Sequence, residues 1–190
     1  MNARFADIAR FAAAAQRCDE RAWPEEARRF AAEHGSAFAR EVLRTLSLFF
    51  GFPPVLRALD LAADTLAARG AADPVPRTIS GAEAFAEVYG SDAAPVLARL
   101  GELDPQLRCW VIEHAYGRAY AGPLLDLQER ERLAVLALAA THCWKQCDSH
   151  LRACLRLGVS LETLCKDASA GDWLPNDARA TLLARIMNAA

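Results

Sequence analysis

Apolar residues recur along the chain at the three- and four-residue spacing of amphipathic helices. In the first such run, Phe5, Ile8, Ala9 and Ala12 form one stripe. Nowhere do apolar and polar residues alternate between hairpin-type turns, which is the pattern typical of strands. The expected helices cover residues 2–15, 24–35, 36–50, 54–69, 80–90, 92–100, 105–121, 126–138 and 142–157, with two shorter ones beginning at Ser160 and Asn176.

Capping signals support several of these helix boundaries. In a capping box, an N-cap side chain and an acidic side chain three residues later bond each other's backbone N–H groups. The expected N-caps are Ser80 with Glu83, Asp126 with Glu129, Asp104 before Pro105, Ser160 and Asn176. Residues 71–78 contain Pro74 and Pro76 and form the one convincing linker.

Composition agrees with an all-α fold. Roughly a fifth of the residues are alanine, well above ordinary usage. Alanine, leucine, arginine and glutamate are strong helix formers, and small side chains let helices pack closely. At 190 residues the chain is long enough for a core without disulfides or metal. We therefore expect one all-helical domain over residues 1–190.

Charge and hydropathy exclude several classes of partner. The formal net charge is -2, whereas nucleic-acid binding requires a basic face. No run approaches the roughly 20 uncharged apolar residues of a membrane span. Residues 1–17 carry Arg4, Asp7 and Arg10 within the apolar stretch, so they do not form a secretory signal. We expect no nucleic-acid partner, no membrane association and a cytoplasmic protein.

One expected helix concentrates the residues that could carry chemistry. Cys143, Cys147, His150 and Cys154 follow one another at spacings of 4, 3 and 4, which puts them on one face. In a chain without a signal peptide, these are expected to be reduced thiols. The first interpretation is core packing, because free cysteine behaves as a small buried hydrophobe.

Two further interpretations of this face are metal binding and redox or acid–base chemistry. A single helix cannot surround one ion with four ligands, and no second ligand cluster is visible, so we expect no metal. A thiolate near a helix N-terminus is stabilised by the helix dipole, which favours Cys143 and Cys147 as reactive groups. Their Cα atoms would be about 6.2 Å apart in an ideal helix, inside the disulfide range. His150, one turn on, could hold or relay a proton.

Ordered local patterns over residues 87–164 resemble a known family. The patterns are Glu87-Val88-Tyr89-Gly90, Glu113-His114-Ala115-Tyr116-Gly117, the run from Leu127 to Leu133, and His150-Leu151-Arg152-Ala153 followed by Gly158-Val159-Ser160. They resemble the carboxymuconolactone decarboxylase family, which includes the alkyl hydroperoxidase D branch. The resemblance implies an alkyl hydroperoxidase D-like helical bundle.

In the hydroperoxidase branch, the motif is a glutamate followed by Cys-x2-Cys-x3-His on the next helix. Glu131, Cys143 and His150 match its glutamate, first cysteine and histidine. The position of the second cysteine is occupied by Gln146, and Cys147 comes one residue late. This departure puts the usual dithiol chemistry of the branch in doubt.

The resemblance implies a thiol-dependent peroxidase or disulfide reductase. Cys147 would attack the peroxide O–O bond and Cys143 would resolve the sulfenic acid to a disulfide, or the two roles could be reversed. Glu131 with His150 would relay the proton. An external dithiol would regenerate the enzyme, and no bound cofactor is required. Relatives of this kind commonly form homotrimers or hexamers, so we expect a homo-oligomer.

Two alternatives remain open. The first is an acid–base decarboxylase that uses His150 with Glu131 and no cysteine. Its substrate would be a small anionic lactone, for which Arg130 or Arg152 would supply positive charge. The second is a non-catalytic helical oligomerisation scaffold with a degenerate site.

The order of motifs along the chain also departs from the family. The family's C-terminal aromatic-Gly-aromatic-Pro motif resembles Phe49-Phe50-Gly51-Phe52-Pro53, near the N-terminus. We therefore expect either a circular permutation or a degenerate tandem, with N-terminal helices in residues 1–70, a family core in 80–165 and a C-terminal helix in 172–190. The helices at 36–50 and 54–69 should then pack near the helix at 142–157.

Overall fold

The computed structural model describes residues 3–67, 74–170 and 173–189, and within these ranges its regular structure is entirely helical. The chain is therefore all-α, as its composition and periodicity predict. The helices are α1 (Ala3–Arg17), α2 (Ala22–His34), α3 (Ser36–Phe50), α4 (Phe52–Leu61), α5 (Ala63–Leu66), α6 (Gly81–Tyr89), η1 (Gly90–Asp92), α7 (Ala93–Leu103), α8 (Pro105–Trp110), η2 (Val111–Ala119), α9 (Leu127–Ala140), α10 (Trp144–Arg156), α11 (Leu161–Ser169) and α12 (Asn176–Asn188).

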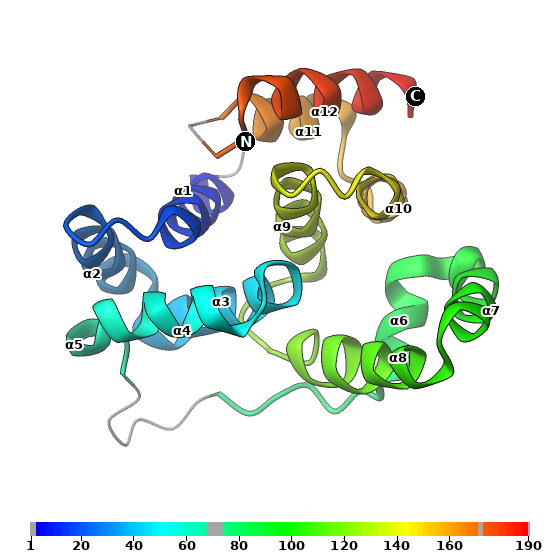
Figure 1. Ribbon diagram of the computed structural model, residues 1–190, viewed down its shortest axis with the longest axis horizontal. Coiled ribbons are helices and arrows are strands. Elements are labelled where there is room, and N and C mark those ends of the chain that lie inside the picture. Colours follow the sequence, from blue (N-terminus) through cyan, green and yellow to red (C-terminus); the bar gives the residue numbers. More distant parts are fainter. Residues whose placement is uncertain (1–2, 68–73, 171–172, 190) are drawn as a thin grey trace.

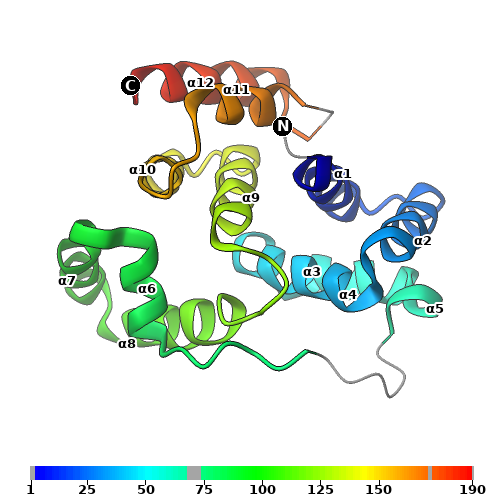
Figure 2. The same ribbon diagram turned by 180° about the vertical axis from the view of Figure 1, so that it is seen from behind.

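Helix α9 is the centre of the fold (Figures 1 and 2). The N-terminal helices α1–α5 lie to one side of it, α6–α8 to the other, and α11 and α12 cover one end. Every residue of α9 from Glu129 to Ala139 is buried, although the run includes four charged residues. Such burial requires each charge to find a partner. Glu129 pairs with Arg4 and Arg132 with Asp167, whereas the partners of Arg130 and Glu131 build the site described below.

The predicted capping boxes both form. The Ser80 hydroxyl accepts from the Glu83 N–H, and the Asp126 carboxylate accepts from the Glu129 N–H, with the reciprocal bonds present. Ser160 also caps as predicted, because its hydroxyl accepts from the Thr163 N–H.

Two predicted boundaries are wrong. Asn176 is the first residue of α12, Pro175 occupies the N-cap, and no side chain caps that end. The single helix expected at 54–69 is broken at Ala62, which separates α4 from α5. Of the predicted linker at 71–78, residues 71–73 lie outside the described residues, and residues 74–78 have no regular secondary structure, as predicted.

The helix predicted for 105–121 begins as expected, with the Asp104 carboxylate accepting from two N–H groups of its first turn. It then widens into the π-helix η2, where the Tyr120 N–H bonds to the Ala115 carbonyl five residues back. Wide turns of this kind are rare and concentrate at functional sites. Helix α6 packs directly on η2, and Gly81 is the point of closest approach.

Gly81→Ala tests this close approach. A Cβ at position 81 would lie 2.0 Å from the carbonyl oxygen of Ile112, a backbone atom that cannot move aside cheaply. We expect the free energy of unfolding in urea to fall by about 1–3 kcal/mol. The matched control is Gly101→Ala in α7, where the new Cβ meets only the flexible end of Arg108. That variant should be neutral or more stable by about 0.5–1 kcal/mol. Equal losses in the two variants would contradict the prediction.

The N-terminal helices meet the predicted family core through α3. Helix α3 packs on α9 and η2, and the ring centroids of Phe49 and His150 are 6.3 Å apart. Helix α4 packs chiefly on α1 and α3. Of the two helices expected near α10, the one at 36–50 therefore reaches it through Phe49. The choice between permutation and tandem stays a prediction.

In the described residues, no helix combines the length and the apolarity needed to cross a membrane.

Candidate functional site: a buried tyrosine–glutamate–histidine relay

Glu131, His150 and Tyr120 form a buried hydrogen-bonded chain. The Glu131 side chain is fully buried, and its Oε2 lies 2.7 Å from Nδ1 of His150. Its other oxygen accepts from the Tyr120 hydroxyl at 2.7 Å. Glu131 comes from α9, His150 from α10 and Tyr120 from the turn after η2, so three elements converge on one carboxylate.

This arrangement determines how the imidazole can act. A carboxylate accepts hydrogen bonds, so Nδ1 of His150 carries the proton in the Glu131 contact. Nε2 is left as the ring nitrogen available for proton transfer. Burial and the nearby Glu131 charge raise the pKa of Tyr120 well above its usual value, so Tyr120 stays a hydrogen-bond donor to Glu131. The relay therefore holds a histidine of defined tautomer and orientation.

A second buried group fixes the turn that carries Tyr120. Arg130, next to Glu131 in the chain, forms an ion pair with the carboxylate of Glu41 from α3. Its guanidinium also donates to the carbonyls of Ala119 and Gly122, on either side of Tyr120. The Glu41 carboxylate accepts the Leu124 and Leu125 N–H groups of the same connection. The ion pair thus anchors the chain from η2 to α9.

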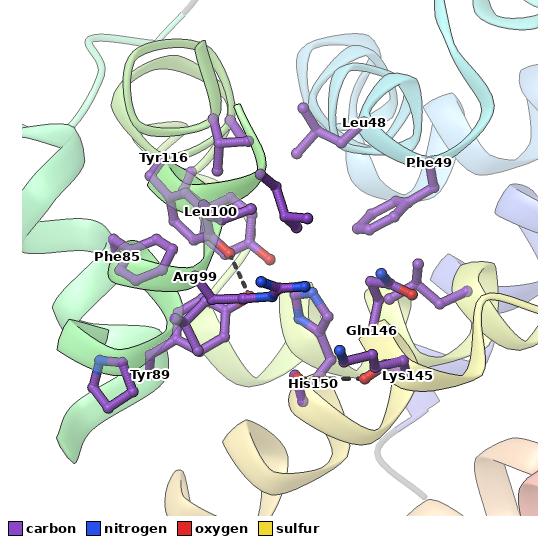
Figure 3. Close-up of a pocket in the computed structure, with 18 residues that line it drawn as sticks. Leu48, Phe49, Phe85, Tyr89, Arg99, Leu100, Tyr116, Lys145, Gln146 and His150 are labelled. Atoms are coloured by element: carbon purple, nitrogen blue, oxygen red, sulfur yellow. Dashed lines mark hydrogen bonds between the residues drawn. The ribbon is translucent and has the colours of Figure 1, made fainter. Parts of the chain in front are cut away.

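His150 opens into a cavity of about 500 Å³ whose exposed lining is mostly apolar. Figure 3 shows the imidazole between the Tyr89 ring and the α10 side chains, with Arg99 extending toward it. The cavity is lined by Leu48, Phe49, Phe85, Tyr89, Pro95, Val96, Arg99, Leu100, Leu103, Val111, Ala115, Tyr116, Tyr120, Leu138, Lys145, Gln146, Ser149 and His150. A cavity of this size and polarity suits a small organic molecule.

The π-helix shapes one wall of this cavity. Val111 and Tyr116 are five residues apart, as are Ala115 and Tyr120, and all four line it. Hydrogen bonds in a π-helix join residues five positions apart, so such pairs lie on the same side of the helix. The Tyr116 hydroxyl donates to the Tyr89 hydroxyl at 3.3 Å, and burial raises the pKa of both tyrosines. The wall thus offers neutral phenols beside His150.

Residues 105–180 match the model of the Carboxymuconolactone decarboxylase family. The match covers less than half of the 190 residues, so the similarity to this family is established for that segment. No curated protein matches the chain. The family segment runs from the first residue of α8 into α12 and contains Glu131, Cys143, Cys147 and His150. It begins later and ends later than the 87–164 stretch over which the sequence motifs resemble the family.

Within the segment that matches the family model, the cysteines are separated from the cavity. Successive residues of an α-helix are rotated by 100°, so Gln146 and His150 face the cavity whereas Cys147 faces α9. The Cys147 sulfur lies 3.7 Å from the Val135 carbonyl oxygen and is fully buried in the main core. Cys143 is the exposed N-cap of α10. Neither sulfur lines the cavity, and a cysteine at the position of Gln146 would.

The buried thiols are expected to be unreactive. Burial raises the pKa of Cys147 to about 12, and the pKa of Cys154 is also raised by burial. At pH 8, about one part in ten thousand of Cys147 is thiolate. Iodoacetamide should therefore alkylate exposed Cys109 and Cys143 first, as read by mass spectrometry. The chain unfolded in guanidinium is the control and should react at all positions. Equal rates for folded Cys147 and Cys143 would contradict the prediction.

Sequence reasoning missed several residues of the site. Tyr89 and Tyr116 appear only within quoted family patterns, and Tyr120, Arg99 and Lys145 carry no local motif. The two arginines proposed for a lactone are not cavity residues. Arg130 is buried against Glu41, and Arg152 donates to the Ser149 hydroxyl on the surface of α10.

A group of possible metal ligands lies away from the relay, within the described residues. Asp7, Glu33 and His34 bring their donor atoms within 4.8 Å of one another. Arg29 already pairs with both carboxylates of this group, which lowers its attraction for a cation. The relay residues themselves offer one imidazole and one carboxylate, fewer protein ligands than a catalytic zinc ordinarily has.

Proposed function

We propose that this protein is an acid–base enzyme that transfers protons at a small organic substrate held in the His150 cavity. The observation that supports it most strongly is the relay itself: Glu131 holds the imidazole, which opens into a largely apolar cavity. Among the described residues, none that lines this cavity carries sulfur. An orienting carboxylate, a histidine and an adjoining cavity are the parts that general acid–base catalysis requires. The first reaction to test is decarboxylation of a small lactone carboxylate.

The residues support a balanced sequence of steps. The bond between the lactone carbon and its carboxylate breaks, CO₂ leaves, and the electron pair remains in the lactone π-system. Protonated His150 delivers the Nε2 proton to carbon, and solvent returns a proton to the imidazole. Glu131 stabilises the imidazolium, and Tyr120 holds Glu131 in place. The low-polarity cavity favours loss of charge as CO₂ departs.

A thiol-dependent alkyl hydroperoxide reductase is the second candidate. It is supported by Cys143, exposed at the N-terminus of α10 with Cys147 one turn away. Two thiols would reduce one hydroperoxide to an alcohol and water and become a disulfide, which an external dithiol would reduce. The burial of Cys147 and its high pKa argue against it as the attacking group.

One experiment separates these candidates. The purified chain is assayed for CO₂ release from carboxymuconolactone and related lactones, and for loss of thiols with an organic hydroperoxide. We expect decarboxylation to survive Cys143→Ser/Cys147→Ser and to disappear in His150→Gln. Rapid loss of two thiols, mapped to a Cys143–Cys147 bridge, would overturn the acid–base proposal in favour of the peroxidase. Absence of both activities would favour the non-catalytic scaffold.

We further infer that the chain assembles as a homo-oligomer in the cytoplasm. Helices α7 and α8 contain no buried residue, and α8 and its neighbours expose Leu103, Leu107 and Trp110. Exposed apolar side chains in such number are typical of interaction surfaces. Sedimentation of the purified protein tests this inference, and a monomer at micromolar concentration would overturn it.

A further inference from the structure

The His150 cavity is polar on one side and apolar on the other. On the polar side, Lys145, Gln146 and Ser149 of α10 stand beside His150, and Arg99 of α7 faces them. The lining from α3 and η2 includes Leu48, Phe49, Val111 and Ala115, which are all apolar. A ligand that fills this cavity therefore meets positive charge from Lys145 and Arg99 and hydrocarbon along α3 and η2.

A second cavity of about 460 Å³ adjoins the apolar side. Leu48, Val111 and Ala115 line both cavities, so the two spaces are neighbours that share apolar residues. Phe52 and Trp110 extend the apolar surface outward, with 59% and 58% of their area exposed. The apolar lining thus continues beyond the first cavity, along α3 and η2.

We propose that the substrate is an amphiphilic carboxylate whose charged group lies near Arg99 and Lys145 and whose alkyl tail crosses into the second cavity. The proposal rests on the proposed function for the role of the first cavity. It names the class of substrate: a carboxylic acid derivative that carries a medium-length alkyl chain. The carboxylate would compete with Glu102 for Arg99, since that exposed ion pair is 3.0 Å long and weak in water.

The chain-length series gives the first test. Binding of hexanoate, octanoate, decanoate and dodecanoate to the wild-type protein is measured by titration calorimetry, below the concentrations at which they aggregate. Each buried methylene contributes about 0.8 kcal/mol, or about a fourfold gain in affinity. We expect the gain to continue past octanoate because the tail enters the second cavity. An affinity that stops rising at hexanoate or at octanoate would overturn the proposal.

Filling the second cavity gives the sharper test. Ser47 lines only that cavity, and its hydroxyl makes just a local bond to the Arg44 carbonyl. Ser47→Phe should leave hexanoate binding unchanged and abolish the extra affinity of dodecanoate, a loss of about tenfold or more. The matched control is Ser91→Phe, at an exposed serine that lines neither cavity. Equal dodecanoate affinities in the two variants would overturn the proposed path.

The position of the ligand's carboxylate group is tested separately. Lys145→Gln should lower affinity for decanoate about two- to fivefold and leave affinity for 1-decanol unchanged, since only the carboxylate needs the ammonium group. Equal loss for both ligands would overturn the orientation. All of these experiments measure ligand affinity, so their results do not depend on catalytic activity. If the protein is inactive toward all lactones, the proposed acid–base function is wrong. The chain-length series would still show whether the alkyl tail enters the second cavity.

Discussion

Glu131→Gln is expected to lower turnover of the substrate by about 10²–10⁴-fold while leaving the fold intact. The amide keeps the size of the carboxylate but cannot stabilise an imidazolium, and it can present an N–H to Nδ1 of His150, which would favour the wrong tautomer. The carboxylate contacts His150 Nδ1 at 2.7 Å and accepts from Tyr120 at the same distance. Turnover and substrate binding are measured on the same preparation.

Tyr120→Phe is the matched control for this prediction. It removes one hydrogen bond to Glu131 and leaves the contact between Glu131 and His150 in place. We expect a smaller loss of turnover, about tenfold, since the phenol acts only through Glu131. Retention of full activity by Glu131→Gln, with an unchanged circular dichroism spectrum, would show that the carboxylate takes no part in the reaction.

Glu41→Leu is expected to lower the free energy of unfolding by about 3–5 kcal/mol. Both partners of the Glu41–Arg130 pair have side chains that are 1% exposed, so loss of the carboxylate leaves a buried guanidinium without its counter-charge. The substitution also removes the acceptor for the Leu124 and Leu125 N–H groups. Denaturation in urea, followed by circular dichroism, measures the loss.

A second substitution in the same pair tests the cause. Glu41→Leu/Arg130→Met replaces both charges by apolar groups and should recover part of the lost stability, as buried ion pairs often do. The exposed pair of Arg77 and Glu87 is the surface comparison, and Glu87→Gln should change stability by less than about 1 kcal/mol. Similar effects of Glu41→Leu and Glu87→Gln would contradict the assignment of the Glu41–Arg130 pair as a structural anchor.

The helical class and the main helix boundaries follow from local information. Capping boxes at Ser80 and Asp126 form because they involve residues only three positions apart. The break at Ala62 and the widening of η2 have no such local cause. The π-helix lies where α6 presses Gly81 against Ile112, a contact between segments that the sequence does not show to be neighbours. Pairings of this kind depend on tertiary packing.

The candidate site likewise contains residues that the sequence identifies and residues whose position depends on tertiary packing. The sequence spacing and the family resemblance single out Glu131 and His150, whose contact the structure contains. Cys143 and Cys147 are chosen by the same spacing, but one residue along an α-helix is a rotation of 100°. That rotation turns Cys147 into the core and presents Gln146 to the cavity.

The all-α fold follows from composition and periodicity, which are local along the chain. The resemblance of residues in the second half of the chain to carboxymuconolactone decarboxylases implies that Glu131 and His150 belong together. Tertiary contacts complete the relay with Tyr120, pair Arg130 with Glu41 as a structural anchor, and give two cavities a shared lining from α3 and η2. Each of these depends on side chains brought together from helices distant in sequence, where packing rather than local preference determines which groups meet.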